Sequence, residues 1–195
     1  KYPIDRKERI IINGLKQTIH IWGSKIENPV ILFLHGGPGV PNRHGMAVAH
    51  MDLLDDFTIV AWDQRGTGGS YFGCDPATLT LEQLIGDCAE LIEYLCRTLQ
   101  KKKIFLLGGS WGTQLGTIVC QKRPERIAGY IGYGQVVNGI ENENVSYAFA
   151  LEKAKEMGCT EFASDCELDN TGSLAFHLAM GFEEMNRVIC FAKKL

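Results

Sequence analysis

Short, mostly apolar segments recur along the chain and are separated by longer amphipathic ones. The apolar segments predict strands at 9–13, 16–22, 30–34, 57–62, 104–107 and 127–132. The first two strands flank Asn13-Gly14, a dipeptide typical of a two-residue hairpin turn. The run at 30–34 is continuously apolar, as strands are when a parallel sheet buries both their faces.

Apolar residues at helical spacing fill most of the intervening segments. They predict helices at 45–54, 80–95, 110–121 and 144–157, and Thr80 followed by Gln83 matches a capping box. Beyond Gly158 the predicted order is strand 160–166, helix 170–180 and strand 185–193. This alternation predicts an α/β fold with a doubly wound, mostly parallel sheet. In it, residues 158–195 would complete the sheet that residues 1–157 begin.

Composition narrows the functional classes. The 195-residue chain has a net charge of −3, so no electrostatic attraction to nucleic acid or to an anionic membrane is expected. No apolar run approaches the ~20 residues that a membrane-spanning helix needs. The seven cysteines include no Cys-x-x-Cys pair and no zinc-type cluster. We therefore expect a reducing cytoplasm as the setting, and neither a metal nor a cofactor.

Candidate chemistry begins at residues 108–112, which read Gly-Gly-Ser-Trp-Gly and match G-x-S-x-G. They lie between a predicted strand and a predicted helix, which is the context of a nucleophile elbow. The glycines are needed because the turn is too sharp for side chains on either side of the serine. Glycine and serine are also common in ordinary strand-to-helix loops. The flanking strand and helix therefore carry the interpretation of Ser110 as a nucleophile rather than as a turn residue.

A second glycine-rich loop follows the predicted strand 30–34. Its sequence at 35–39, His-Gly-Gly-Pro-Gly, lets backbone N–H groups approach a substrate, as in an oxyanion hole. The N–H of Trp111, the residue after the serine, would complete such a hole. A phosphate-binding loop is the alternative interpretation, but G-x-G-x-x-G and P-loop spacings are both absent from the sequence.

Three segments together carry a family resemblance: residues 35–39, residues 108–112, and Asp-Gln-Arg-Gly-Thr-Gly-Gly-Ser at 63–70. In order and spacing they resemble the proline iminopeptidase-like branch of the α/β-hydrolases, over roughly residues 1–157. The resemblance implies a serine aminopeptidase-like hydrolase that removes an N-terminal residue, often proline, from short peptides or amides. It assigns Ser110 as nucleophile and the amides of Gly37 and Trp111 as oxyanion donors. For Arg65 we favour an internal salt bridge over a substrate contact.

Residues 158–195 resemble a different family, the C-terminal end of aminoglycoside 6′-N-acetyltransferases of the GNAT superfamily. The similar segments are Cys-Thr-Glu-Phe-Ala-Ser-Asp at 159–165, residues 170–173, Phe-His at 176–177 and Gly-Phe-Glu-Glu at 181–184. That superfamily's pyrophosphate loop, Q/R-x-x-G-x-G/A, is absent from the sequence, which counts against acetyl transfer. We therefore predict a chimera with its joint at Gly158.

The catalytic base is the open part of this prediction, because the family's cap and histidine-bearing strand are not recognisable in the sequence. His177 is a candidate base, although its apolar neighbours favour a partly buried helix histidine. Asp165, near the end of the predicted strand 160–166, is the candidate acid. Two hypotheses follow: a serine hydrolase of impaired activity towards a small peptide or amide, and an inactive chimeric scaffold. Either would leave a sheet edge exposed for pairing in a homo-oligomer.

Overall fold

The computed structural model describes residues 3–49, 51–161, 163, 166 and 170–185. The chain divides into two units, Lys1–Asn142 (unit 1) and Glu143–Leu195 (unit 2). The predicted division after residue 157 therefore falls inside unit 2. Among the described residues the strands all lie in unit 1: β1 (Ile4–Ile12), β2 (Leu15–Gly23), β3 (Val30–Leu34), β4 (Thr58–Asp63), β5 (Ile104–Gly109) and β6 (Ile127–Tyr133). The α-helices are α1 (Arg43–Ala49), α2 (Leu81–Thr98), α3 (Trp111–Lys122), α4 (Gly139–Glu156) and α5 (Thr171–Ala179).

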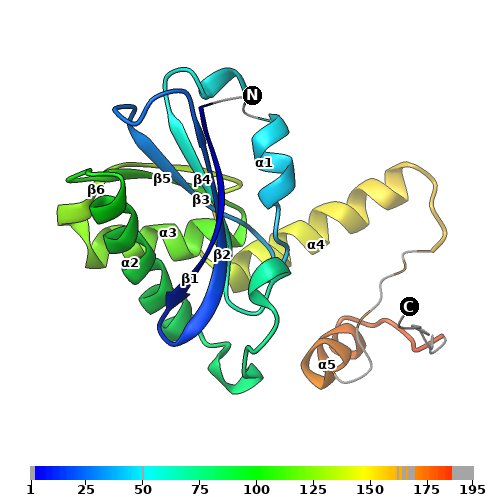
Figure 1. Cartoon of the computed structure of the whole chain (residues 1–195). Coiled ribbons are helices and arrows are strands. Elements are labelled where there is room, and N and C mark those ends of the chain that lie inside the picture. The colour runs from blue at the N-terminus through cyan, green and yellow to red at the C-terminus, as the bar shows by residue number, and fades with distance from the viewer. Residues whose placement is uncertain (1–2, 50, 162, 164–165, 167–169, 186–195) are drawn as a thin grey trace, which may run out of the picture. The chain divides into compact units, whose positions relative to one another are not determined.

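The strands form one mixed sheet in the order β1-β2-β4-β3-β5-β6 (Figure 1). The predicted parallel arrangement is confirmed for β3 to β6, whereas the hairpin of β1 and β2 joins β4 in antiparallel fashion. The chain passes from β3 to β4 on one side and then returns to β5 on the other side of β3. This reversal creates a topological switch point at the carboxyl ends of β3 and β5, where open α/β sheets bind ligands.

Alternating side chains of the central strands separate two apolar layers. In β3, Leu32 and Leu34 are buried in the same cluster as residues of α2 and α3, and Phe33 is buried against Met46 of α1. The sheet is therefore covered on both faces, with α1 on one side and α2 and α3 on the other (Figure 1). Burial on both faces explains why β3 is apolar at every position.

One of the two hydrogen bonds of the capping box predicted at the start of α2 is present. Thr80 is the N-cap, and its side chain accepts a hydrogen bond from the Gln83 backbone N–H. The Gln83 side chain does not complete the box, because the Thr80 N–H donates to Thr78 O and the Gln83 amide donates to Asp87. The local signal thus located the helix start, and a buried carboxylate decided where the Gln83 side chain goes.

Helix boundaries differ from the prediction where a polar side chain or a turn intervenes. α4 begins at Gly139, five residues before the predicted start, because Asn138 Oδ1 accepts from the Glu141 N–H and caps it. α1 begins at Arg43 and ends at Ala49, and a 3₁₀ turn, Met51–Leu53, takes up the end of the predicted helix 45–54. The other short 3₁₀ helices are Gly68–Ser70, Pro76–Thr78 and Pro124–Arg126.

Of the predicted strand–helix–strand at the C-terminus, the described residues contain the helix, α5. Within 160–166 the described residues, 160, 161, 163 and 166, are not in a strand, and the other three lie outside the described residues. Of the predicted strand 185–193, only Met185 is described, and it is not in a strand. No described helix is both long enough and apolar enough to cross a membrane.

Candidate active site

Ser110 occupies a strained turn between β5 and α3. Its φ of 50° and ψ of −123° lie outside the regions that side-chain-bearing residues ordinarily adopt. Hydrogen bonds fix this backbone: the Ser110 N–H donates to Tyr133 O at 3.0 Å, and Ser110 O accepts from both the N–H and the Oγ1 of Thr113. The side chain itself is exposed. A strained, exposed serine at a strand-to-helix turn is the geometry of a nucleophile elbow.

The glycines around Ser110 are required by close approach. A Cβ on Gly112 would overlap the carbonyl oxygen of Leu34, and a Cβ on Gly108 would lie 2.8 Å from Gly112 O. α3 can therefore begin directly behind the carboxyl end of β3 only if these positions lack side chains. This places the N-terminus of α3, with its free N–H groups, next to the serine.

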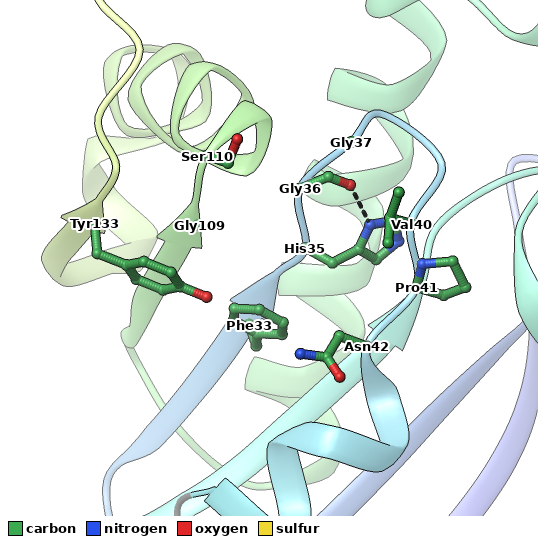
Figure 2. A pocket seen from close by; sticks show the side chains of 10 residues that line it. All are labelled: Phe33, His35, Gly36, Gly37, Val40, Pro41, Asn42, Gly109, Ser110 and Tyr133. Carbon is green, nitrogen blue, oxygen red and sulfur yellow. Dashed lines mark hydrogen bonds between the residues drawn. The ribbon is translucent and has the colours of Figure 1, made fainter. Parts of the chain in front are cut away.

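The loop after β3 passes directly in front of the elbow. A Cβ on Gly36 would lie 3.1 Å from both Ser110 Cβ and Gly109 O, and Gly37 has a φ of 114° that favours glycine. Figure 2 shows Ser110 and Tyr133 on one side of the pocket and the loop of residues 35–42 on the other. The cavity between them measures about 340 Å³ and is lined by Phe33, His35, Gly36, Gly37, Val40, Pro41, Asn42, Gly109, Ser110 and Tyr133. It lies at the switch point of the sheet.

His35 is a buried histidine that connects this loop to the end of β4. Its Nδ1 donates to Gly36 O at 3.0 Å, and its Nε2 accepts from the Gln64 backbone N–H at 3.3 Å. The Gln64 side-chain amide donates in turn to His35 O. Burial lowers the pKa of His35, although the Gly36 carbonyl and the Asp63 carboxylate oppose this shift.

The segment 63–70 is a loop beside the site whose side chains make internal contacts. Asp63 accepts from Arg43 Nε at 3.0 Å and from the Gly69 N–H at 2.8 Å. Arg65 forms the internal salt bridge that we expected, donating from Nε and Nη2 to the two carboxylate oxygens of the fully buried Asp87. The hydrogen bond to Asp87 is the main cause that raises the pKa of Arg65, so this guanidinium stays charged.

Within unit 1, the described residues bring no histidine into hydrogen-bond contact with Ser110. His20 Nε2 donates to Asp5 Oδ1 and the ring stacks on Trp22. His44 lies exposed on α1, and His50 is outside the described residues. His177 is in unit 2, where its Nδ1 donates to Ser173 O at 2.7 Å within α5. Asp165, the candidate acid, also lies outside the described residues. The candidate nucleophile and both candidate oxyanion donors belong to unit 1, whereas the candidate base and acid belong to unit 2.

Sequence reasoning missed Tyr133, Asn42 and Gln64. Tyr133 lies near the end of β6, and a Cβ on Gly109 would be 2.5 Å from its ring, so this ring forms one wall of the cavity. Nothing in the sequence near Ser110 marks Tyr133, because it enters the site only through the pairing of β5 with β6. Gln64 lies in the segment 63–70, which the sequence analysis singled out. Its position directly after a buried strand was the signal that could have marked it as a site residue. In the described part of the chain, no group of three or more His, Cys, Asp or Glu residues could hold a metal ion.

The sheet order, the switch-point cavity and the elbow define an α/β-hydrolase. Consistent with this, the alpha/beta hydrolase fold family matches residues 29–164, and the chain belongs to that family. The match includes the β3 loop, segment 63–70 and the elbow. It also extends past Gly158, the predicted joint of a chimera.

Three relatives are similar to the chain over much of its length. It is 37% identical over 153 residues to a probable aminopeptidase of Bacillus subtilis, covering 78% of this chain and 48% of that protein. It is 33% identical over 120 residues to a proline iminopeptidase of Lactobacillus acidophilus, covering 60% and 40%. The solved structure of a proline iminopeptidase-related protein from Thermus thermophilus superposes with a TM-score of 0.59 at 26% identity, covering 69% and 46%. The chain thus spans about half the length of these relatives or less.

A short stretch is similar to an unrelated enzyme. The chain is 52% identical over 42 residues to an aminoglycoside N(6′)-acetyltransferase of Acinetobacter haemolyticus, covering 22% of this chain and 29% of that protein. The resemblance predicted for residues 158–195 is to the same family of acetyltransferases. The chimera itself stays a prediction.

Proposed function

We propose that the chain carries the nucleophile half of a serine aminopeptidase of the proline iminopeptidase type. Ser110 is the nucleophile, and the backbone amides of Gly37 and Trp111 are the oxyanion donors. The observation that carries the proposal is the strained φ of Ser110 at the carboxyl end of β5, facing the loop after β3. The similarity to aminopeptidases and proline iminopeptidases supports a small peptide or amide as the substrate.

In this proposal Ser110 Oγ attacks the carbonyl carbon of the substrate's N-terminal residue. The carbonyl oxygen becomes an oxyanion beside the start of α3, where the helix dipole and the Trp111 N–H stabilise negative charge. Collapse of this intermediate breaks the C–N bond, and the amine leaves with the proton that Ser110 Oγ has lost. An ester remains on Ser110, and water then hydrolyses it to free the acid and restore the hydroxyl. One oxyanion donor contributes about 2.7–4 kcal/mol to such a transition state.

In this proposal the chain's turnover is impaired because no residue is established as the base that takes the proton from Ser110 Oγ. A serine hydroxyl is a weak nucleophile without a base in hydrogen-bond reach. His177 is the candidate base and Asp165 the candidate acid, but His177 Nδ1, the atom that a triad acid would orient, is already bonded to Ser173 O. The competing function, an inactive chimeric scaffold, predicts a folded protein with no reactive serine.

Labelling with a fluorophosphonate probe, read by intact mass, separates these two functions. Reaction joins Ser110 Oγ to phosphorus, expels fluoride and gives the serine proton to a base or to solvent. We expect one label on the parent and none on Ser110→Ala, with the exposed Ser146→Ala as the matched control that still labels. His177→Gln and Asp165→Asn then test the base and the acid by their labelling rates. A folded parent that takes no label would support the inactive scaffold instead.

Acetyl transfer is the remaining candidate, and the 42-residue similarity to an acetyltransferase is the observation that favours it. A ligand that binds only the native state must raise its apparent stability. Millimolar acetyl-CoA should leave the melting temperature unchanged if the chain has no cofactor site. A rise in melting temperature would indicate a site for acetyl-CoA and would favour acetyl transfer.

A further inference from the structure

We propose that His35 is a positioning residue: a neutral, Nδ1-protonated imidazole that joins the oxyanion loop to the end of β4 through Gln64. The proposal rests on the proposed function, because the loop in question carries Gly37, the assigned oxyanion donor. His35 and Gln64 lie 29 residues apart in sequence and are both almost fully buried. We call their pair of hydrogen bonds the 35–64 clasp.

The protonation of His35 follows from the chemistry of its two partners. Gly36 O can only accept, so Nδ1 must carry the proton in that hydrogen bond. The Gln64 backbone N–H can only donate, so Nε2 must supply its lone pair. One nitrogen donates and the other accepts, which is possible only for the neutral ring. A protonated His35 would present an N–H to the Gln64 N–H and break the clasp.

The clasp is anchored on a rigid element. Gln64 directly follows β4, and its side-chain amide returns a hydrogen bond to His35 O at 3.2 Å. The preceding residue, Asp63, is held by Arg43 Nε and the Gly69 N–H, all in buried or half-buried positions. Asp63 is the charged group that acts on the His35 ring, and it forms an ion pair with Arg43 at 3.0 Å. The β4 side of the clasp therefore has little freedom to move.

On its other side, the loop packs closely against the nucleophile. Gly36 is so close to Ser110 and Gly109 that a single added Cβ would come within 3.1 Å of each. The clasp and the elbow thus hold the loop from opposite sides, and Gly37 follows immediately. Displacement of a catalytic group by about 1 Å costs on the order of 100-fold in rate. Loss of the clasp should therefore lower reactivity without changing the cavity's chemistry.

Two histidine variants separate the two hydrogen bonds. In His35→Gln the side-chain oxygen reaches the Nε2 position and can accept from Gln64, whereas in His35→Asn the side-chain amide reproduces only the donor to Gly36 O. We expect His35→Asn to lower the maximal fluorophosphonate labelling rate by about 100-fold at an unchanged half-saturating probe concentration, and His35→Gln to restore most of it. Gln64→Leu keeps the backbone N–H that donates to His35 Nε2 and removes only the side-chain bond to His35 O, so it should lower the rate less than His35→Asn does. Gln121→Leu, on the exposed end of α3, is its control.

Nitrogen-15 NMR of the histidine rings tests the clasp without reference to activity. The expected His35 signal is that of an Nδ1-protonated neutral ring in the parent protein. An Nε2-protonated or charged His35 at neutral pH overturns the proposal, as does full labelling of a folded His35→Asn. If the parent takes no label at all, the proposed function fails by itself, and the NMR signal alone then supports or overturns the clasp.

Discussion

Asp87 has no solvent exposure, yet its carboxylate accepts five hydrogen bonds. They come from four side chains: Asn13, Gln17, Arg65 and Gln83. A buried charge is tolerated only when it is paired and fully hydrogen-bonded. The pair joins the β1–β2 turn, the loop after β4 and α2, so it fixes three segments that are distant in sequence.

Removing one member of this pair should be strongly destabilising. Asp87→Asn leaves the Arg65 guanidinium buried without a counter-charge, and we expect a loss of about 3–5 kcal/mol in the free energy of unfolding. Urea unfolding followed by circular dichroism measures it. The control is Glu125→Gln, which breaks an exposed pair with Arg123 at 3.8 Å and should change stability by less than about 1 kcal/mol. Equal effects of the two variants would contradict the structural role of Asp87.

His35 predicts a pH dependence of stability with a definite sign. Its folded-state pKa lies below the ordinary histidine value of about 6.5, so near and below that pH the unfolded chain binds more protons than the folded one. Stability from this group is therefore complete above pH 6.5 and is lost as pH falls towards the folded pKa, by at most about 1.4 kcal/mol per pH unit. The difference between parent and His35→Gln in urea unfolding at pH 8 and pH 5.5 isolates it. A parent that gains stability relative to the variant on acidification would refute this assignment.

At the scale of elements, two helix glycines that look alike in the sequence have opposite roles. A Cβ on Gly86, inside α2, would only touch Asn13 Nδ2 at 3.5 Å, whereas a Cβ on Gly112, in α3, would overlap the Leu34 carbonyl. Gly86→Ala should raise the free energy of unfolding by about 0.5–1 kcal/mol, because alanine loses less entropy in a helix. Gly112→Ala should lower it by about 1–3 kcal/mol, because α3 must move off β3. Parallel urea titrations compare them, and a neutral Gly112→Ala would show that α3 is not seated on β3 as described.

Strands of mostly apolar sequence were the elements that the sequence predicted best. β3 matches its predicted range in full, and β2, β4, β5 and β6 differ by at most two residues at either end. β1 was predicted to begin at residue 9 but begins at Ile4, because its charged residues are exposed and only pairing with β2 extends it. An exposed edge strand leaves little hydrophobic pattern, so its length is set by its partner rather than by its own residues.

The site residues also fall into two groups: those that a local sequence pattern marks, and those that only long-range contacts bring together. Ser110 and its glycines could be placed from the sequence because the elbow is a continuous five-residue signal. The clasp of His35 with Gln64, the Arg43–Asp63 pair and the Tyr133 wall arise from residues brought together by sheet pairing, which no local pattern encodes. The same limit applies to the base, since a triad histidine is adjacent to its serine in space and not in sequence.

At the scale of the whole molecule, the feature that matters for self-association is the edge strand β6. It ends the sheet, and no described strand pairs with its outer side. Its sequence, Ile-Ala-Gly-Tyr-Ile-Gly-Tyr, has no charged residue or proline of the kind that protects edge strands, and Ile131 and Tyr133 are each about half exposed. An unprotected, uncharged edge is a template for pairing with another strand.

We therefore expect the chain to form a homodimer in which two β6 strands pair antiparallel. Ile131→Lys should shift the protein to a monomer, because the symmetric dimer would bring two like charges together along the new edge. Sedimentation velocity at two protein concentrations measures this, with Ile26→Lys, equally exposed but in the loop before β3, as the control. A parent that sediments as a monomer at both concentrations would contradict the prediction. A dimer insensitive to Ile131→Lys but broken by Ile26→Lys would move the interface to the loop between β2 and β3.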